Sequence, residues 1–106
     1  MRSSLVFLAV FAPVLAFAAE PEFTITLRDH RFDPVEVHVP SGQRVKLIVD
    51  NQDPTPEEFE SKVLKKEKVI PGKSKATILI GPLRPGRYPF VGEFNEKTAQ
   101  GAIVAD

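Results

Sequence analysis

Two glutamates, Glu58 and Glu60, flank Phe59 in a short segment with the pattern of a β-strand. If Phe59 and Val63 face a hydrophobic core, the two carboxylates share the opposite face, roughly 6–7 Å apart along the strand. Carboxylate oxygens suit hard or borderline cations such as Fe(II), Fe(III), Mn(II) and, with nitrogen ligands added, Cu(II). The spacing indicates a candidate metal site. The competing interpretation is that these charges lie on a solvated strand face.

Other side chains could join or replace this pair. Glu57 would take the place of Glu58 if the strand began one residue earlier. Glu67 follows the strand and could fold back towards it. His30 lies in a turn, and turns can bring an imidazole nitrogen to a metal. His38 falls on the polar face of a different predicted strand, where we expect it to be exposed.

Sulfur ligands are absent from the candidate site. The chain has no cysteine, and its single methionine is Met1. Soft ligands that favour Cu(I) or iron–sulfur clusters are therefore missing, and no disulfide can form. The sequence predicts that any bound metal is held by oxygen and nitrogen, and that no type 1 copper centre is present.

Other function classes find little support. We find no nucleophilic serine with a matching histidine and aspartate, no glycine-rich phosphate loop and no zinc-protease spacing. A hydrolase would also need a substrate pocket larger than so small a domain offers. The 14 basic and 14 acidic residues balance, so nucleic acid is not an expected partner. Metal-assisted oxidation is the enzymatic activity left open.

The first residues have the pattern of a secretory signal peptide. Arg2 precedes an apolar run over residues 5–18 that ends in Ala16-Phe17-Ala18, a small-residue cleavage motif. Pro13 interrupts the run, which is short for a membrane span. We expect a signal peptide over residues 1–18, a single domain over residues 19–106, and a periplasmic location after cleavage.

The rest of the chain predicts an all-β fold. Apolar residues alternate with polar ones near residues 23–27, 35–39 and 45–50, which is typical of half-buried strands. Further strands are expected near residues 59–64, 66–70, 75–80, 87–91 and 101–105. Proline and glycine separate these runs. Seven or eight short strands at this spacing favour a Greek-key β-sandwich.

The order of these residues resembles the cupredoxin superfamily. The resemblance covers residues 22–105 and is carried by Phe32, Pro34, Val37, Val39, Pro40, Gly42, Val45, Leu47, Asn51, Pro71, Gly72, Leu83, Pro85, Gly86, Tyr88, Phe90, Gly101, Ile103 and Val104. In blue-copper members, a cysteine, a histidine and a methionine of the last loop bind the metal. Those positions match Gly92, Asn95 and, approximately, Ala99.

Three segments resemble one branch of that superfamily more closely: residues 57–61, 67–72 and 92–101. The branch comprises the cupredoxin domain of EfeO-type proteins and the partners of Ftr-type ferrous iron permeases in bacterial iron uptake. The resemblance implies iron or copper binding, with or without iron oxidation. It also implies an inner-membrane iron permease and a periplasmic iron-binding protein as partners.

The cupredoxin frame also implies where the glutamates meet. In that frame the segment 57–61 carries the first histidine ligand, at the same end as the loop 92–101. Glu93 would then lie across from Glu58 or Glu60. We therefore expect a metal site made by Glu58, Glu60 and Glu93, with Glu67 or His30 as a further ligand. The alternative is a metal-free cupredoxin-fold module for protein interaction in the periplasm.

Overall fold

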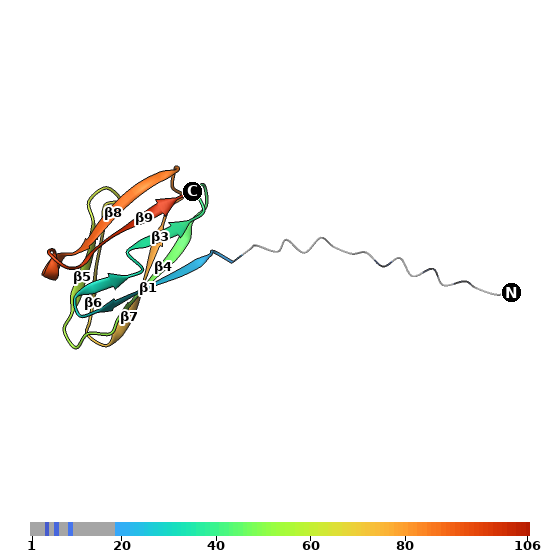
Figure 1. Ribbon diagram of the computed structural model, residues 1–106. Coiled ribbons are helices and arrows are strands. Elements are labelled where there is room, and N and C mark those ends of the chain that lie inside the picture. Colours follow the sequence, from blue (N-terminus) through green and yellow to red (C-terminus); the bar gives the residue numbers. More distant parts are fainter. Residues whose placement is uncertain (1–3, 5, 7–8, 10–18) are drawn as a thin grey trace.

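The computed structural model describes residues 4, 6, 9 and 19–106, and folds the last of these ranges into two packed β-sheets (Figure 1). The strands are β1 Glu22–Arg28, β2 Arg31–Asp33, β3 Glu36–Val39, β4 Val45–Asn51, β5 Glu57–Ser61, β6 Lys66–Ile70, β7 Ser74–Ile80, β8 Gly86–Gly92 and β9 Gln100–Ala105. A single 3₁₀ turn, η1, spans Glu93–Asn95. The predicted all-β sandwich is confirmed, with nine strands because residues 31–33 form a short one.

The predicted signal peptide, residues 1–18, lies outside the described residues except at positions 4, 6 and 9. In the part of the chain that the structure describes, no helix has the length and apolar character needed to cross a membrane.

The strands form one four-stranded and one five-stranded sheet. Their orders are β2-β1-β4-β7 and β3-β9-β8-β5-β6. β1 pairs with β4, and β3 with β9, in parallel, whereas the other neighbours are antiparallel. β6, with Lys66 and Lys68, is an edge strand of the five-stranded sheet. Lysine on an edge discourages pairing with another chain.

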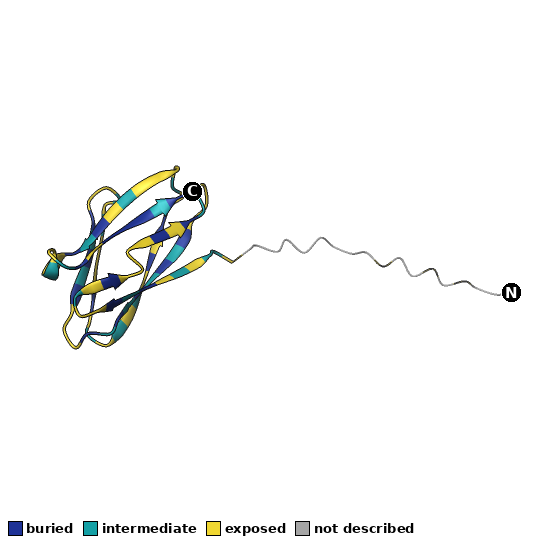
Figure 2. Ribbon diagram, viewed as in Figure 1, coloured by how far each residue is buried: buried dark blue, intermediate teal, exposed yellow. Residues whose placement is uncertain are grey.

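The core lies between the two sheets and follows from the alternation in the sequence. β4 alternates between fully buried and half-buried residues along its whole length (Figure 2). Three aromatic rings meet at the centre: the centroid of Phe90 lies 5.1 Å from that of Phe32 and 4.9 Å from that of Phe59. These rings fix the spacing of β8 against β5 and β2, and therefore the place where β8 ends.

Two predicted strands differ from the observed ones at their ends. β5 covers Glu57–Ser61 and not residues 59–64, so Val63 lies in a turn and is exposed instead of facing the core. The Ser61 hydroxyl ends the strand, because it donates to the Pro89 carbonyl and accepts from the Leu64 N–H. Val35, predicted to point inward, is also exposed, because β3 begins one residue later.

The loops that carry the candidate site residues lie at one end of the sandwich. The strands β1, β4 and β8 end there and β5 begins there, while the carboxyl terminus lies at the opposite end (Figure 1). Buried Asn51 donates to the carbonyls of Thr55, Ile70 and Pro71. This side chain holds the loop between β4 and β5, and so sets where β5 starts.

Gly101 tests the packing between β9 and the aromatic core. A Cβ atom there would lie 2.5 Å from the Phe90 ring and 2.9 Å from the Val35 carbonyl oxygen. Because Phe90 packs against two other rings, it cannot move aside. We expect Gly101→Ala to lower the free energy of unfolding by about 1–3 kcal/mol in urea denaturation. Lys68→Ala, on the exposed edge, should change it by less than about 0.5 kcal/mol; equal effects would contradict the packing described.

Candidate metal centre

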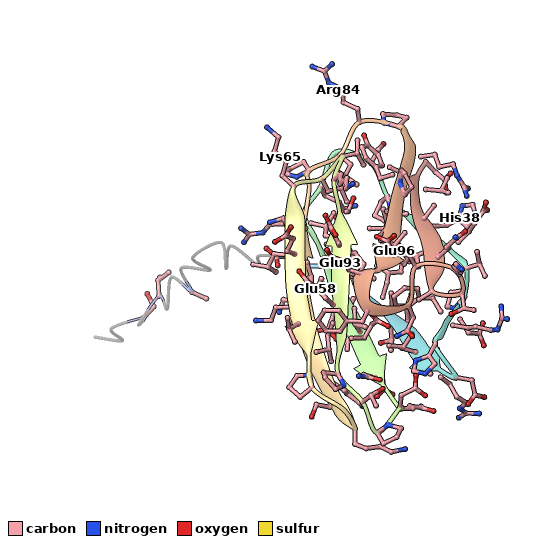
Figure 3. All side chains as sticks on the ribbon, turned by 90° about the vertical axis from the view of Figure 1, so that its left-hand side faces the viewer. His38, Glu58, Lys65, Arg84, Glu93 and Glu96 are labelled. Atoms are coloured by element: carbon pink, nitrogen blue, oxygen red, sulfur yellow. The ribbon has the colours of Figure 1, made fainter. Side chains whose placement is uncertain are left out.

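Glu58 and Glu60 lie on the outer face of β5, as the sequence predicts. Phe59 between them is fully buried, and both glutamates are half-buried. β5 pairs with β8 so that Phe59 is opposite Gly92 and Glu60 is opposite Val91. Glu93 follows Gly92 directly, so it lies beside β5, one position beyond the Phe59–Gly92 pair and level with Glu58. Figure 3 labels Glu58 on its strand and Glu93 and Glu96 around the turn.

The carboxyl groups of Glu60 and Glu93 meet on this face. The pKa of Glu60 is raised, first because its carboxyl shares a hydrogen bond with that of Glu93, and then because of partial desolvation and charge repulsion by Glu93. Lys62 opposes the shift. Two carboxylates this close repel unless a proton or another cation lies between them. Two of the sequence-predicted residues, Glu60 and Glu93, are thus close together on this face.

Glu67 lies directly opposite Glu60 in the pairing of β6 with β5. Residues opposite each other in an antiparallel pair project from the same face of the sheet. Glu67 therefore lies on the same face as Glu60, and its part in a metal site stays a prediction. Even so, among the described residues, no three His, Cys, Asp or Glu side chains are already arranged around a common metal position. The full ligand set stays a prediction.

His30 lies at the same end of the sandwich but faces another carboxylate. Its Nδ1 is 3.6 Å from Oδ2 of Asp53, and the ring lines a shallow depression shared with residues 93–98. Asp53 is buried and accepts hydrogen bonds from the backbone N–H groups of Asp29 and His30. The sequence analysis missed Asp53, whose role is to hold the β1–β2 turn. His30 therefore lies near Glu60 and Glu93 but faces Asp53 instead of these two carboxylates.

Glu57 lies on the opposite face from the other glutamates. It is only 1% exposed and points inward beneath η1. Its Oε1 accepts from the backbone N–H groups of Glu58 at 3.1 Å and Phe94 at 2.8 Å. Its Oε2 accepts from Nδ2 of Asn95 at 2.6 Å. Glu57 is therefore no substitute for Glu58 on the outer face, because it belongs to a separate buried network.

Gly92 lies against this buried carboxylate. A Cβ atom at Gly92 would be 2.7 Å from Cδ of Glu57 and 2.7 Å from the Cβ of Ala99. The Gly92 N–H donates to the Ala99 carbonyl, which closes the loop between β8 and β9. Gly92, Asn95 and Ala99, three to seven positions apart in the sequence, thus lie together beside Glu57.

The family model of the cupredoxin-like domain matches residues 2–105. The chain belongs to this family. An uncharacterized protein of Rickettsia prowazekii (strain Madrid E) is 42% identical over 85 residues, which are 80% of this chain and 68% of that protein.

Two solved structures place copper-binding proteins on the same fold. The metal-binding domain of the Cu(I)-exporting P-type ATPase CopA of Streptococcus pneumoniae, with Cu(I), has a TM-score of 0.71 and 15% identity, over 80% of this chain and 84% of that one. Auracyanin A, a blue copper protein of Chloroflexus aurantiacus, has a TM-score of 0.65 and 14% identity, over 83% and 100%. At these identities the likeness shows the cupredoxin fold alone.

A type 1 copper ion does not fit the residues of this cupredoxin. The positions that the resemblance matches to its ligands hold Gly92, Asn95 and Ala99, which supply no thiolate, imidazole or thioether. The side chain of Glu57 occupies the space beside Gly92, and its oxygens already accept three N–H groups. The Glu57 side chain therefore fills the place where the resemblance puts the copper ligands. Oxygen donors open to solvent lie on the outer face instead.

Replacing Glu93 tests the carboxyl pair. In Glu93→Gln we expect the pKa of Glu60 to fall towards the ordinary glutamate value, measured by ¹³C NMR titration of the side-chain carboxyl. A raised pKa in the folded protein gives stability at low pH that is lost as pH rises through that pKa. In Glu93→Gln, the free energy of unfolding should no longer decline over this pH range. Glu67→Gln, as control, should move the pKa of Glu60 less; an unchanged pKa in Glu93→Gln would refute the pairing.

Replacing Gly92 tests the contact with Glu57. A Gly→Ala change in an open strand stabilises a protein by about 0.4–1 kcal/mol. Here the added methyl group overlaps Glu57 and Ala99, so Gly92→Ala should lower the free energy of unfolding by about 1–3 kcal/mol. Thermal and urea denaturation show whether the free energy of unfolding rises or falls in the variant. Ala99→Gly in the same chain should restore part of the loss, and a stabilising Gly92→Ala would show that the space is open.

Proposed function

We propose that this cupredoxin-like protein binds iron or copper through outer-face carboxylates and assists bacterial iron uptake in the periplasm. The observation that carries the proposal is the strand pairing that brings Glu58 and Glu60 of β5 and Glu93 after β8 to one face of the sheet. The raised pKa of Glu60 beside Glu93 agrees with it. A multivalent cation relieves the repulsion between such a pair. Glu58 on the same strand face and Glu67 across the β5–β6 pair supply further oxygen donors.

The ligand chemistry supports hard or borderline ions. Carboxylates favour Fe(II), Fe(III) and Cu(II) over the soft Cu(I) ion. Glu58, Glu60 and Glu67 lie on two paired strands of the five-stranded sheet, and Glu93 lies in the turn that follows a third. His30, at the same end, could complete the set if its ring turned from Asp53 towards the loop.

The proposed partners rest on the resemblance of residues 57–61, 67–72 and 92–101 to iron-uptake cupredoxins. We propose that the protein receives or passes iron between a periplasmic iron-binding protein and an inner-membrane permease. If iron is oxidised here, Fe(II) is the substrate held by the carboxylates, and each ion gives one electron to an external acceptor such as dioxygen or Cu(II). Oxygen ligands favour the more highly charged Fe(III) product. The apolar N-terminal run supports export to the periplasm.

A second candidate function is a metal-free interaction module of the periplasm. A specific observation favours it: an open depression of about 400 Å³ on the five-stranded sheet, lined mainly by apolar atoms, with Val63, Pro89 and Val91 beside Glu60 and Glu96. Dialysis separates the two candidates. If the mature protein retains neither iron nor copper after dialysis against Fe(II), Fe(III) and Cu(II), the second function stands and the first fails.

Metal titration of matched variants tests the proposed site. Calorimetric titration of the mature chain with Cu(II), Fe(II) and Fe(III) should show 10- to 100-fold weaker binding in Glu60→Gln and Glu93→Gln, about 1–3 kcal/mol each. Glu58→Gln should lose affinity in the same direction. Protons compete for the same oxygens, so affinity should fall as pH drops through the raised pKa of Glu60.

The control is Glu22→Gln, which neutralises an exposed glutamate on the other sheet, close to Lys46. It should bind all three ions as the unmodified protein does. If Glu60→Gln and Glu93→Gln also bind like Glu22→Gln, the outer-face site is wrong.

A further inference from the structure

The most unusual group in the molecule outside the proposed metal site is the buried carboxylate of Glu57. In the described part of the chain, no Lys, Arg or His nitrogen lies within ion-pair distance of it. Burying a carboxylate without a partner is costly, so hydrogen bonds must compensate. Three N–H donors do so, and two of them come from residues 37 and 38 positions further along the chain.

The turn that supplies these donors has little else to hold it. None of the residues of η1 is buried, and the Phe94 side chain is 53% exposed. Within the loop, the N–H groups of Thr98 and Ala99 donate to the Asn95 carbonyl, which shapes the turn but does not attach it to the sheet. Attachment comes from the Gly92–Ala99 contact at the base and from Glu57 at the tip.

We infer that the Glu57 carboxylate performs here the structural task that a metal ion performs in copper-binding cupredoxins, tying the last loop to the first ligand-bearing strand. In the cupredoxin frame, a metal joins a ligand of the segment 57–61 to ligands of the loop 92–101. In this chain the same two segments are joined by hydrogen bonds from Asn95 and Phe94 to Glu57. The loop is therefore closed without metal.

A second consequence follows for Glu93, which directly precedes the held N–H group of Phe94. Fixing that peptide unit fixes the backbone from which the Glu93 side chain extends towards Glu60. Glu57 is thus a positioning residue for the outer-face pair, acting through the η1 backbone from the opposite face of the sheet. The metal-free protein keeps Glu93 in place, so an arriving cation meets a preformed pair.

The experiment uses the mature protein freed of metal with EDTA. Asn95→Leu nearly preserves side-chain size but removes the donor to Glu57. Thr98→Val is the matched control in the same loop, because the Thr98 hydroxyl makes only a long 3.4 Å contact with the Asn95 carbonyl. Two quantities are measured by NMR: the hydrogen-exchange rate of the Phe94 N–H and the backbone order parameter of Glu93.

We expect the Phe94 N–H to be protected in the metal-free protein. In Asn95→Leu its exchange should become about tenfold faster, the effect of losing one hydrogen bond, and the order parameter of Glu93 should fall as the turn loosens. Thr98→Val should change neither quantity. A Phe94 N–H that is unprotected without metal would overturn the inference, and this result requires no variant to fold. So would an Asn95→Leu protein in which the order parameter of Glu93 is unchanged.

Neither readout involves bound metal. The inference therefore stands if the outer-face site binds no ion, and the proposed function stands if the loop proves to be held in another way.

Discussion

The organisation of the functional end depends on the burial of one carboxylate. Glu57 lies under the last loop with almost no exposure, and its oxygens need donors that the surrounding apolar core cannot supply. The donors come from the backbone of Glu58 and Phe94 and from the amide of Asn95. Satisfying this group requires η1 to fold directly over the start of β5. The position of Glu93, and with it the outer-face pair, follows from that requirement.

The same carboxylate explains how a cupredoxin-like fold persists here without its usual copper chemistry. Gly92 leaves room for both the Glu57 side chain and the Ala99 methyl group, each of which has an atom 2.7 Å from where a Cβ atom of residue 92 would lie. Each of these residues is small where a ligand would be large. Gly92, Asn95 and Ala99 are therefore explained together by the presence of Glu57, and not as three separate losses of copper ligands. The aromatic contacts of Phe59 and Phe90 keep β5 and β8 in register beneath this set.

Much of this arrangement could be predicted from the sequence. Alternation places Glu58 and Glu60 outward around buried Phe59, and the cupredoxin frame brings Glu93 to the same edge. The inward position of Glu57 was also present in the pattern, since it lies two residues before Phe59. It was missed because a buried carboxylate is unfavourable unless donors are available, and those donors are distant in sequence. Asp53 was missed for the same reason, because its partners belong to the β1–β2 turn.

The central claim is that metal, where it binds, binds outside the loop that Glu57 closes. Anomalous X-ray scattering from crystals of the mature protein soaked in Cu(II) or Fe(III) would test it most directly. The account predicts an anomalous peak on the outer face between Glu60 and Glu93, with the hydrogen bonds of Glu57 to Phe94 and Asn95 intact. A peak between Glu57 and Asn95, with those hydrogen bonds broken, would contradict it.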